Sequence, residues 1–265
     1  MRQIGLNLVT IRDGRDGGRL KDTLRLVKRA GFDGVGIWVN TIEDWVGSGR
    51  GIAQMAGLVR DAGLAVHEVC FVPVFDQDDR LLDQSRVFDW AAELGCPNVI
   101  AIYGRPTDPL EVARENWATF VAQVEHTGVS PTFEFIGPWP AYNSPDAAWE
   151  VVQAGPELGS IVLDAFHFWR GGGDLDGLDR VPGDRIALVH LNDVKDVPRE
   201  EAKDSDRTYP GEGIIPLEEI LRRLDANGFD GPLSVEIFGE LQKEDPDEVA
   251  VRACETARGV ATSLS

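Results

Sequence analysis

Cysteine and histidine are scarce in this sequence, with three cysteines and four histidines among 265 residues. Cys70, Cys96 and Cys254 are isolated, without a CxxC pair or a cluster with histidine. Such spacing predicts neither a structural zinc site nor a disulfide framework. We therefore expect reduced thiols and a cytoplasmic location, where disulfides rarely persist.

Long apolar runs and dense basic runs are also absent. No apolar run is long enough to span a bilayer, and the first residues, MRQIGLNLVT, lack the apolar core of a signal peptide. Lys and Arg number 26 against 45 Asp and Glu, which gives a formal net charge of −19. Because such a chain is repelled by nucleic acid and anionic lipid, we expect neither a nucleic-acid nor a membrane partner. The oligomeric state stays open, a homo-oligomer included.

A repeating unit organises the chain. An amphipathic helical run ends at a glycine and a short apolar strand follows, as in AAELGCPNVIAIYG at 91–104. The glycine stands where a left-handed residue closes a helix. The pattern recurs at 26–39, 58–72 and 221–239. The predicted strands cover residues 4–10, 33–39, 65–72, 98–103, 131–136, 160–166, 185–192 and 232–238. The predicted helices cover 20–30, 52–62, 78–94, 109–126, 145–154, 216–227 and 246–263, with a weak helix or loop at 174–183.

This alternation predicts the fold class. Eight strands alternating with helices over this length favour an α/β fold of the (β/α)₈ (TIM) barrel type. An open doubly wound sheet is the rival, but no GxGxxG follows the first strand. Without a linker or a low-complexity segment, we expect a single domain over residues 1–265.

Four of the later predicted strands each carry an ionisable residue near the carboxyl end, where barrel enzymes place catalytic groups. The residues are Glu134 in TFEFIG, Asp164 in IVLDAF, His190 in ALVHLND and Glu236 in LSVEIFG. Each has apolar neighbours on both sides, so strand alternation turns all four toward the barrel interior. Three converging carboxylates repel one another unless a cation lies between them. A divalent metal with oxygen and nitrogen ligands meets this need.

The stretch IVLDAFHFWRGG, residues 161–172, poses a question about two polar residues three positions apart. A strand alternates its faces at every residue, so Asp164 and His167 would point in opposite directions. If the strand ends near Phe166, the glycines that follow allow a turn, and His167 reaches the same pocket from the rim.

Other candidates lie in loops and on early strands. Arg207 stands in a long polar segment after His190, where a guanidinium could reach the mouth of the barrel. Trp139, in GPWPAYNS, and Trp38 are candidates for an aromatic wall against a sugar ring. Glu68 interrupts an apolar strand and is a weaker candidate for substrate binding.

These motifs together resemble the xylose isomerase-like (β/α)₈ family of sugar isomerases and epimerases, over essentially the whole chain. The resemblance rests on FEFIG, LDAFHF, VHLND, DRTYPGEG and SVEIF, and it is strongest toward inosose isomerases. It implies one divalent ion, Mn²⁺, Co²⁺, Mg²⁺ or Zn²⁺, on Glu134, Asp164, His190 and Glu236. It also implies that the two glutamates are the acid/base pair and that His167 and Arg207 contact the substrate.

The resemblance implies isomerisation or epimerisation of a small ketose or cyclitol (keto-inositol) through a metal-bound cis-enediolate. A lyase acting at the same site is the alternative, as in keto-inositol or dehydroshikimate dehydratases and C-glycoside-cleaving subunits. A metal-dependent DNA-repair endonuclease is disfavoured by the four histidines and the charge of −19. A binding protein with a vestigial site is disfavoured because all four ligand positions carry ligating residues.

Overall fold

The computed structural model describes residues 2–74 and 84–262. In this part of the chain, eight parallel strands close into a barrel in the order β1-β10-β7-β6-β5-β4-β3-β2. Their bounds are β1 Ile4–Asn7, β2 Gly34–Trp38, β3 Ala65–Val74, β4 Asn98–Tyr103, β5 Ser130–Glu134, β6 Ser160–Asp164, β7 Ile186–Leu191 and β10 Leu233–Val235. The (β/α)₈ prediction is thus confirmed.

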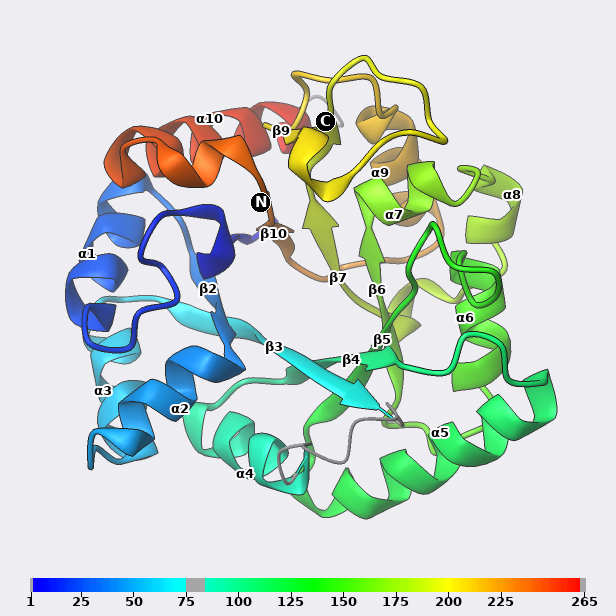
Figure 1. The fold of residues 1–265 in the computed structure, drawn as a ribbon, viewed down its shortest axis with the longest axis horizontal. Coiled ribbons are helices and arrows are strands. Elements are labelled where there is room, and N and C mark those ends of the chain that lie inside the picture. The colour runs from blue at the N-terminus through cyan, green and yellow to red at the C-terminus, as the bar shows by residue number, and fades with distance from the viewer. Residues whose placement is uncertain (1, 75–83, 263–265) are drawn as a thin grey trace.

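Helices surround the barrel (Figure 1). The predicted ones are α1 Leu20–Ala30, α3 Ile52–Asp61, α4 Gln84–Leu94, α5 Leu110–Val124, α6 Pro145–Val152, α9 Leu217–Ala226 and α10 Pro246–Thr262. Positions 78–83 of the helix predicted at 78–94 lie outside the described residues. The glycines expected to close helices, Gly31, Gly63, Gly95 and Gly228, all have positive φ.

Several strands end earlier in the structure than the sequence predicts. Strand β1 ends at Asn7, whose side chain caps the 3₁₀ helix η1 Leu8–Thr10. Strand β2 ends at Trp38, and helix α2 Val39–Gly47, which was not predicted, follows at once. Its apolar start continues the apolar run of the strand, which concealed the boundary. The weak helix expected at 174–183 is a single turn, α8 Leu175–Leu178.

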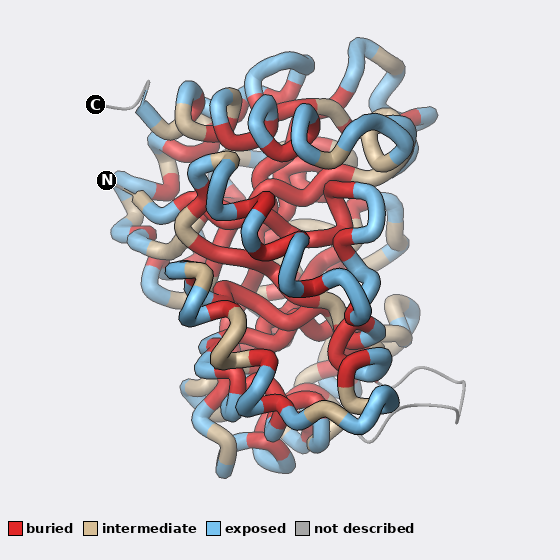
Figure 2. The backbone as a smooth tube through the Cα atoms, turned by 90° about the vertical axis from the view of Figure 1, so that its left-hand side faces the viewer, coloured by how far each residue is buried: buried red, intermediate tan, exposed pale blue. Residues whose placement is uncertain are grey.

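The core has an inner and an outer part. Inside the barrel, Cys70, Ile100, Val162 and Leu188 form a small apolar cluster below the strand ends. A much larger apolar layer lies between strands and helices. Figure 2 shows this distribution, with buried segments running through the middle and exposed ones on the outside. Among the described helices, none combines the length and the apolar character needed to cross a membrane.

Strand register aligns polar residues across the barrel. One set is Asn7 on β1 and Glu68 on β3, both in register with Gly36 on β2, and the other is Ser234 on β10, His190 on β7 and Asp164 on β6. The two sets occupy adjacent arcs of the closed barrel, in which β1 pairs with β10 and β3 lies across the interior from β7. Their side chains can therefore meet in its interior.

Candidate active site

The structure brings together the four residues expected to bind metal. Glu134 ends β5, Asp164 ends β6, His190 lies in β7 and Glu236 directly follows β10, and all four are buried. Each offers a ligand atom within 4.8 Å of those of the others. His190 Nδ1 lies 3.3 Å from Glu236 Oε2, 3.5 Å from Glu134 Oε1 and 3.8 Å from Asp164 Oδ2.

The electrostatics of this cluster call for a cation. Burial raises the pKa of Glu134 and of Glu236. Burial opposes a charge on His190 as well, but Glu236 and Glu68 outweigh it and raise the pKa of the imidazole well above its ordinary value. Within the described residues, His190 Nδ1 makes no hydrogen bond although it is buried. Three carboxylate oxygens and one imidazole nitrogen are a donor set that fits a divalent ion.

Metal binding at this cluster is expected to release protons and to weaken as the pH falls. The pKa values of His190, Glu134 and Glu236 are raised, which favours the protonated forms, and a metal that binds these groups must displace such protons. Calorimetric titration with Mn²⁺ in two buffers of different ionisation enthalpy counts the released protons. An affinity that is independent of pH, with no proton release, would contradict this expectation.

Asp164 has a second role at the end of β6. Its Oδ1 accepts a hydrogen bond of 2.8 Å from the backbone N–H of His167 and so caps helix α7, Ala165–Arg170. The strand therefore ends at Asp164, two residues before the predicted end near Phe166. The helix turns the chain, and His167 lines a pocket together with Glu134 and Glu236, the partners of Asp164 in the buried cluster.

Arg207 reaches the cluster from the long segment after His190. The guanidinium is buried, and its Nη1 lies 2.6 Å from Asp164 Oδ2 and 3.5 Å from Glu236 Oε2. Its Nη2 lies 2.8 Å from Asp204 Oδ1 and 3.5 Å from His167 Nε2. Burial opposes ionisation of Asp164, but the nearby guanidinium and histidines hold the pKa of that carboxyl below its usual range.

Asp193 fixes the segment that carries Arg207. The short strands β8 Asp193–Val194 and β9 Arg207–Thr208 form an antiparallel pair. The carboxylate of Asp193 accepts hydrogen bonds of 2.9 to 3.0 Å from the backbone N–H groups of Gly211, Gly213 and Ile215. One buried carboxylate thus organises the PGEG turn beside the arginine.

A pocket of about 190 Å³ opens over the cluster. The described residues that line it are Trp38, Cys70, Phe71, Ile102, Glu134, Ile136, His167, Asp204, Arg207, Glu236 and Phe238. Trp38 stands edge-on to both Phe71 and Phe238. The indole Nε1–H of Trp38 donates to Asn7 Oδ1 at 2.7 Å, so this wall is fixed to β1.

Two predicted substrate contacts lie elsewhere. Glu68 is fully buried beneath His190, and neither it nor Trp139 is among the described residues that line the pocket. Trp139 lies in the turn after β5, where its backbone N–H bonds to Ile136. This placement differs from the expectation that both touch substrate. The residue type of Glu68 indicated a polar site, but a single strand position carries no information about depth in the barrel.

Sequence reasoning missed the polar residues that support the site. Asn7 Nδ2 donates to Glu236 Oε1 at 3.0 Å, and Asn192 Nδ2 donates to Asp164 Oδ2 at 3.0 Å. Asn192 Oδ1 also accepts from the backbone of Phe166 at 2.9 Å. An asparagine within the apolar start IGLNLVT was the one available signal for Asn7.

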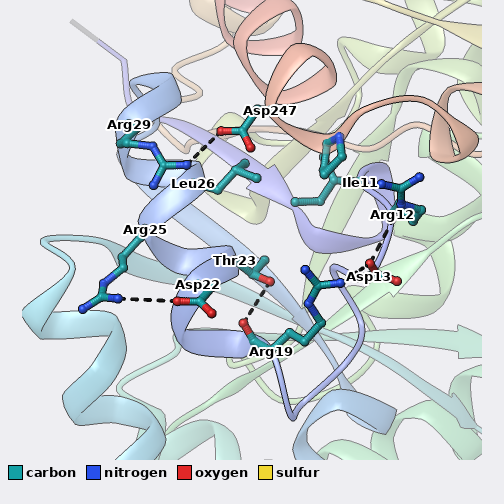
Figure 3. Close-up of a pocket in the computed structure, with 11 residues that line it drawn as sticks. Ile11, Arg12, Asp13, Arg19, Asp22, Thr23, Arg25, Leu26, Arg29 and Asp247 are labelled. Carbon is teal, nitrogen blue, oxygen red and sulfur yellow. Dashed lines mark hydrogen bonds and ion pairs between the residues drawn. The ribbon is translucent and has the colours of Figure 1, made fainter.

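A second hollow, of about 320 Å³, lies outside the barrel between α1 and the start of α10 (Figure 3). Its arginines are paired: Arg19 with Asp13, Arg25 with Asp22, and Arg29 with Asp247. The pairs are largely exposed, and such ion pairs contribute little. The buried ionisable cluster, in contrast, is inside the barrel.

Comparison with known proteins agrees with this architecture. A profile of the family described as xylose isomerase-like TIM barrel matches residues 24–258. The chain belongs to this family.

Two curated relatives and two solved structures illustrate the range. A 3-dehydroshikimate dehydratase of Pseudomonas putida is 30% identical over 84% of this chain and 36% of its own length. An inosose isomerase of Halalkalibacterium halodurans is 37% identical over 42% of this chain and 40% of its own length. The chain thus spans roughly two fifths of each relative. The IOLI protein with a bound zinc atom superposes with a TM-score of 0.87 at 22% identity, covering 99% of both chains. An L-ribulose 3-epimerase superposes with a TM-score of 0.75 at 21% identity, covering 100% of this chain and 98% of its own.

Proposed function

We propose that this protein is a divalent-metal-dependent isomerase or epimerase of a ketose or keto-inositol, with an activity like that of inosose isomerases. The observation that carries the proposal is the convergence of Glu134 and Glu236 on His190 Nδ1, in a pocket that also holds His167 and Arg207. Two buried carboxylates with raised pKa values suit a reaction in which one accepts a proton and the other supplies one.

Each residue then has a defined task. Glu134, Asp164, His190 and Glu236 would hold the ion, which when bound supplies a Lewis acid that polarises a carbonyl and acidifies the neighbouring C–H. One of the two glutamates removes that proton, and the other returns one. His167 and Arg207 donate hydrogen bonds to the substrate oxygens and stabilise the enediolate. Return to the opposite face of the same carbon gives an epimer, and return to the neighbouring carbon gives an isomer.

The charge of the pocket favours a neutral substrate. Among the described lining residues, Arg207 is the only one that is permanently cationic, and it is already paired with Asp164 and Asp204. Burial lowers the pKa of His167, which favours its neutral form. Apart from the proposed metal ion, a carboxylate or phosphate on the substrate would therefore meet carboxylates and no unpaired, permanently cationic side chain among the described lining residues. A keto-inositol or ketose fits this environment better than dehydroshikimate does.

Elimination of water is the second candidate, because it begins with the same removal of a proton next to a carbonyl. The names of two relatives favour it: the dehydroshikimate dehydratase and an inosose dehydratase of Lacticaseibacillus casei, 28% identical over 37% of this chain. The dehydroshikimate dehydratase match covers more of this chain than the inosose isomerase match does. We give more weight to the lack of an unpaired, permanently cationic side chain among the described lining residues, because a buried carboxylate on the substrate needs a partner.

Incubation in heavy water with a panel of keto-inositols and ketohexoses, and with dehydroshikimate, tests the proposal. We expect deuterium to enter neutral substrates at the carbon next to the carbonyl, and mass spectrometry to show no loss of water. A product that is lighter than its substrate by one water molecule would identify the lyase. No exchange with any member of the panel, in protein shown to contain metal, would contradict the proposal.

A further inference from the structure

Glu68 is a buried carboxylate that the proposed chemistry does not use. It lies in β3 with no exposed surface and reaches across the barrel interior to β7 and β10. Its Oε2 accepts a hydrogen bond of 2.6 Å from His190 Nε2, and its Oε1 accepts one of 2.6 Å from Ser234 Oγ. Asn7 Nδ2 lies 3.3 Å from the same Oε1. Each oxygen of a group that is costly to bury thus has a donor.

A glycine on the neighbouring strand β2 leaves space for the Glu68 carboxylate. Gly36 pairs with Glu68 in the register of β2 and β3. A Cβ on Gly36 would overlap Oε1 and the carboxyl carbon of Glu68. Gly34, two residues earlier on the same strand, is close to the His67 ring instead. The strand therefore has glycine where the Glu68 side chain passes.

The contact with Glu68 determines how His190 presents its two nitrogens. Because Nε2 donates to Glu68, the proton on that nitrogen is fixed and the ring cannot turn over without breaking a 2.6 Å bond. Nδ1 then faces Glu134, Asp164 and Glu236. A carboxylate behind a histidine ligand fixes the ring and makes it a stronger donor to metal.

We infer that Glu68 is a positioning residue that holds His190 Nδ1 toward the three carboxylates and so sets the affinity of the site for a divalent ion. The inference rests on the proposed metal site. Glu68 acts through His190 and does not touch substrate, which replaces its expected role in substrate binding. A purely structural role would give the same burial, but it would not link Glu68 to metal affinity.

Zinc titration with a competing chromophoric chelator tests this in the whole protein. Loss of a partner behind a metal ligand typically lowers affinity by about 10- to 100-fold. We expect the upper part of that range for Glu68→Leu, and the lower part for Glu68→Gln, which keeps a neutral acceptor. Gly36→Ala should also weaken binding, because it displaces the carboxylate without altering any polar group. Gly34→Ala is the matched control, since its added methyl meets His67 and not Glu68.

Nitrogen-15 NMR of histidine-labelled protein gives a second readout, and only four histidines need assignment. We expect a protected Nε2 proton on His190 in the wild type, with and without zinc, and its loss in Glu68→Leu. If Glu68→Leu does not fold, Glu68→Gln and Gly36→Ala carry the test.

The outcomes separate the two proposals. Wild-type protein that binds no zinc, manganese, cobalt or magnesium would refute the metal-dependent function and the inference with it. Wild-type protein that binds metal, with folded Glu68→Leu, Glu68→Gln and Gly36→Ala within about twofold of its affinity, would refute the inference alone.

Discussion

Glutamine in place of Glu134 or Glu236 is expected to lower turnover by about 10²- to 10⁴-fold, the usual contribution of a positioned acid or base. Each variant removes one of the two carboxylates that face His190 Nδ1 and keeps the shape of the side chain. Initial rates on the most active ketose or keto-inositol provide the measurement. Metal content should be determined in the same samples, because both residues are also proposed ligands.

The fold should survive these substitutions. Burial raises the pKa of Glu134 and of Glu236 in the folded protein, so their ionised forms oppose folding above the ordinary carboxyl pKa. That cost grows as the pH rises through the raised values, and glutamine removes it. We expect metal-free variants to melt at or above the wild-type temperature near neutral pH. Glu157→Gln, on the exposed surface, is the control for loss of one charge. Wild-type rates in both active-site variants would remove the two glutamates from the mechanism.

Removal of metal is expected to abolish activity, and Mn²⁺, Co²⁺, Mg²⁺ or Zn²⁺ to restore it to different extents. Without a divalent ion, three buried carboxylates lie beside a histidine and an arginine, and the proposed Lewis acid is missing. Thermal unfolding should move with activity, because an ion at 100 times its dissociation constant stabilises the folded state by about 2.7 kcal/mol.

Dialysis against EDTA, followed by return of each metal, provides the measurement. EDTA already saturated with the metal under test is the control for effects of the chelator itself. Full turnover by protein that elemental analysis shows to be free of metal would exclude the metal from the reaction.

The strand face on which the proposed metal ligands lie could be predicted from the periodicity of the sequence, whereas the ends of the strands could not. Glu134, Asp164 and His190 could be placed on one side of the strands because a strand alternates its faces at every residue. The end of β6 could not, because Ala165 and Phe166 continue an apolar run although Asp164 already caps a helix. Local sequence does not reveal which polar atom will offer a cap.

Contacts across the barrel could not be predicted from the sequence, for a different reason. Glu68 and His190 lie 122 positions apart, and their meeting depends on the register of every strand between them. Asp193 presents the same difficulty, since its partners at Gly211 and Gly213 become visible only when the segment has folded back. Residue type indicated polarity at these positions, but the partner is a property of the closed barrel.

The pairing of β1 with β10 has a consequence for how the molecule is assembled. Asn7 on the first strand holds Glu236 after the last strand, across 229 positions of chain. Asn7 can therefore support the proposed cation site only after the barrel has closed, one of the most non-local steps available to this chain. Until then β1 and β10 are open edges that can pair with other chains. If the contact with Asn7 tightens cation binding, a higher cation concentration during refolding should favour the closed form and reduce the protein lost to aggregation.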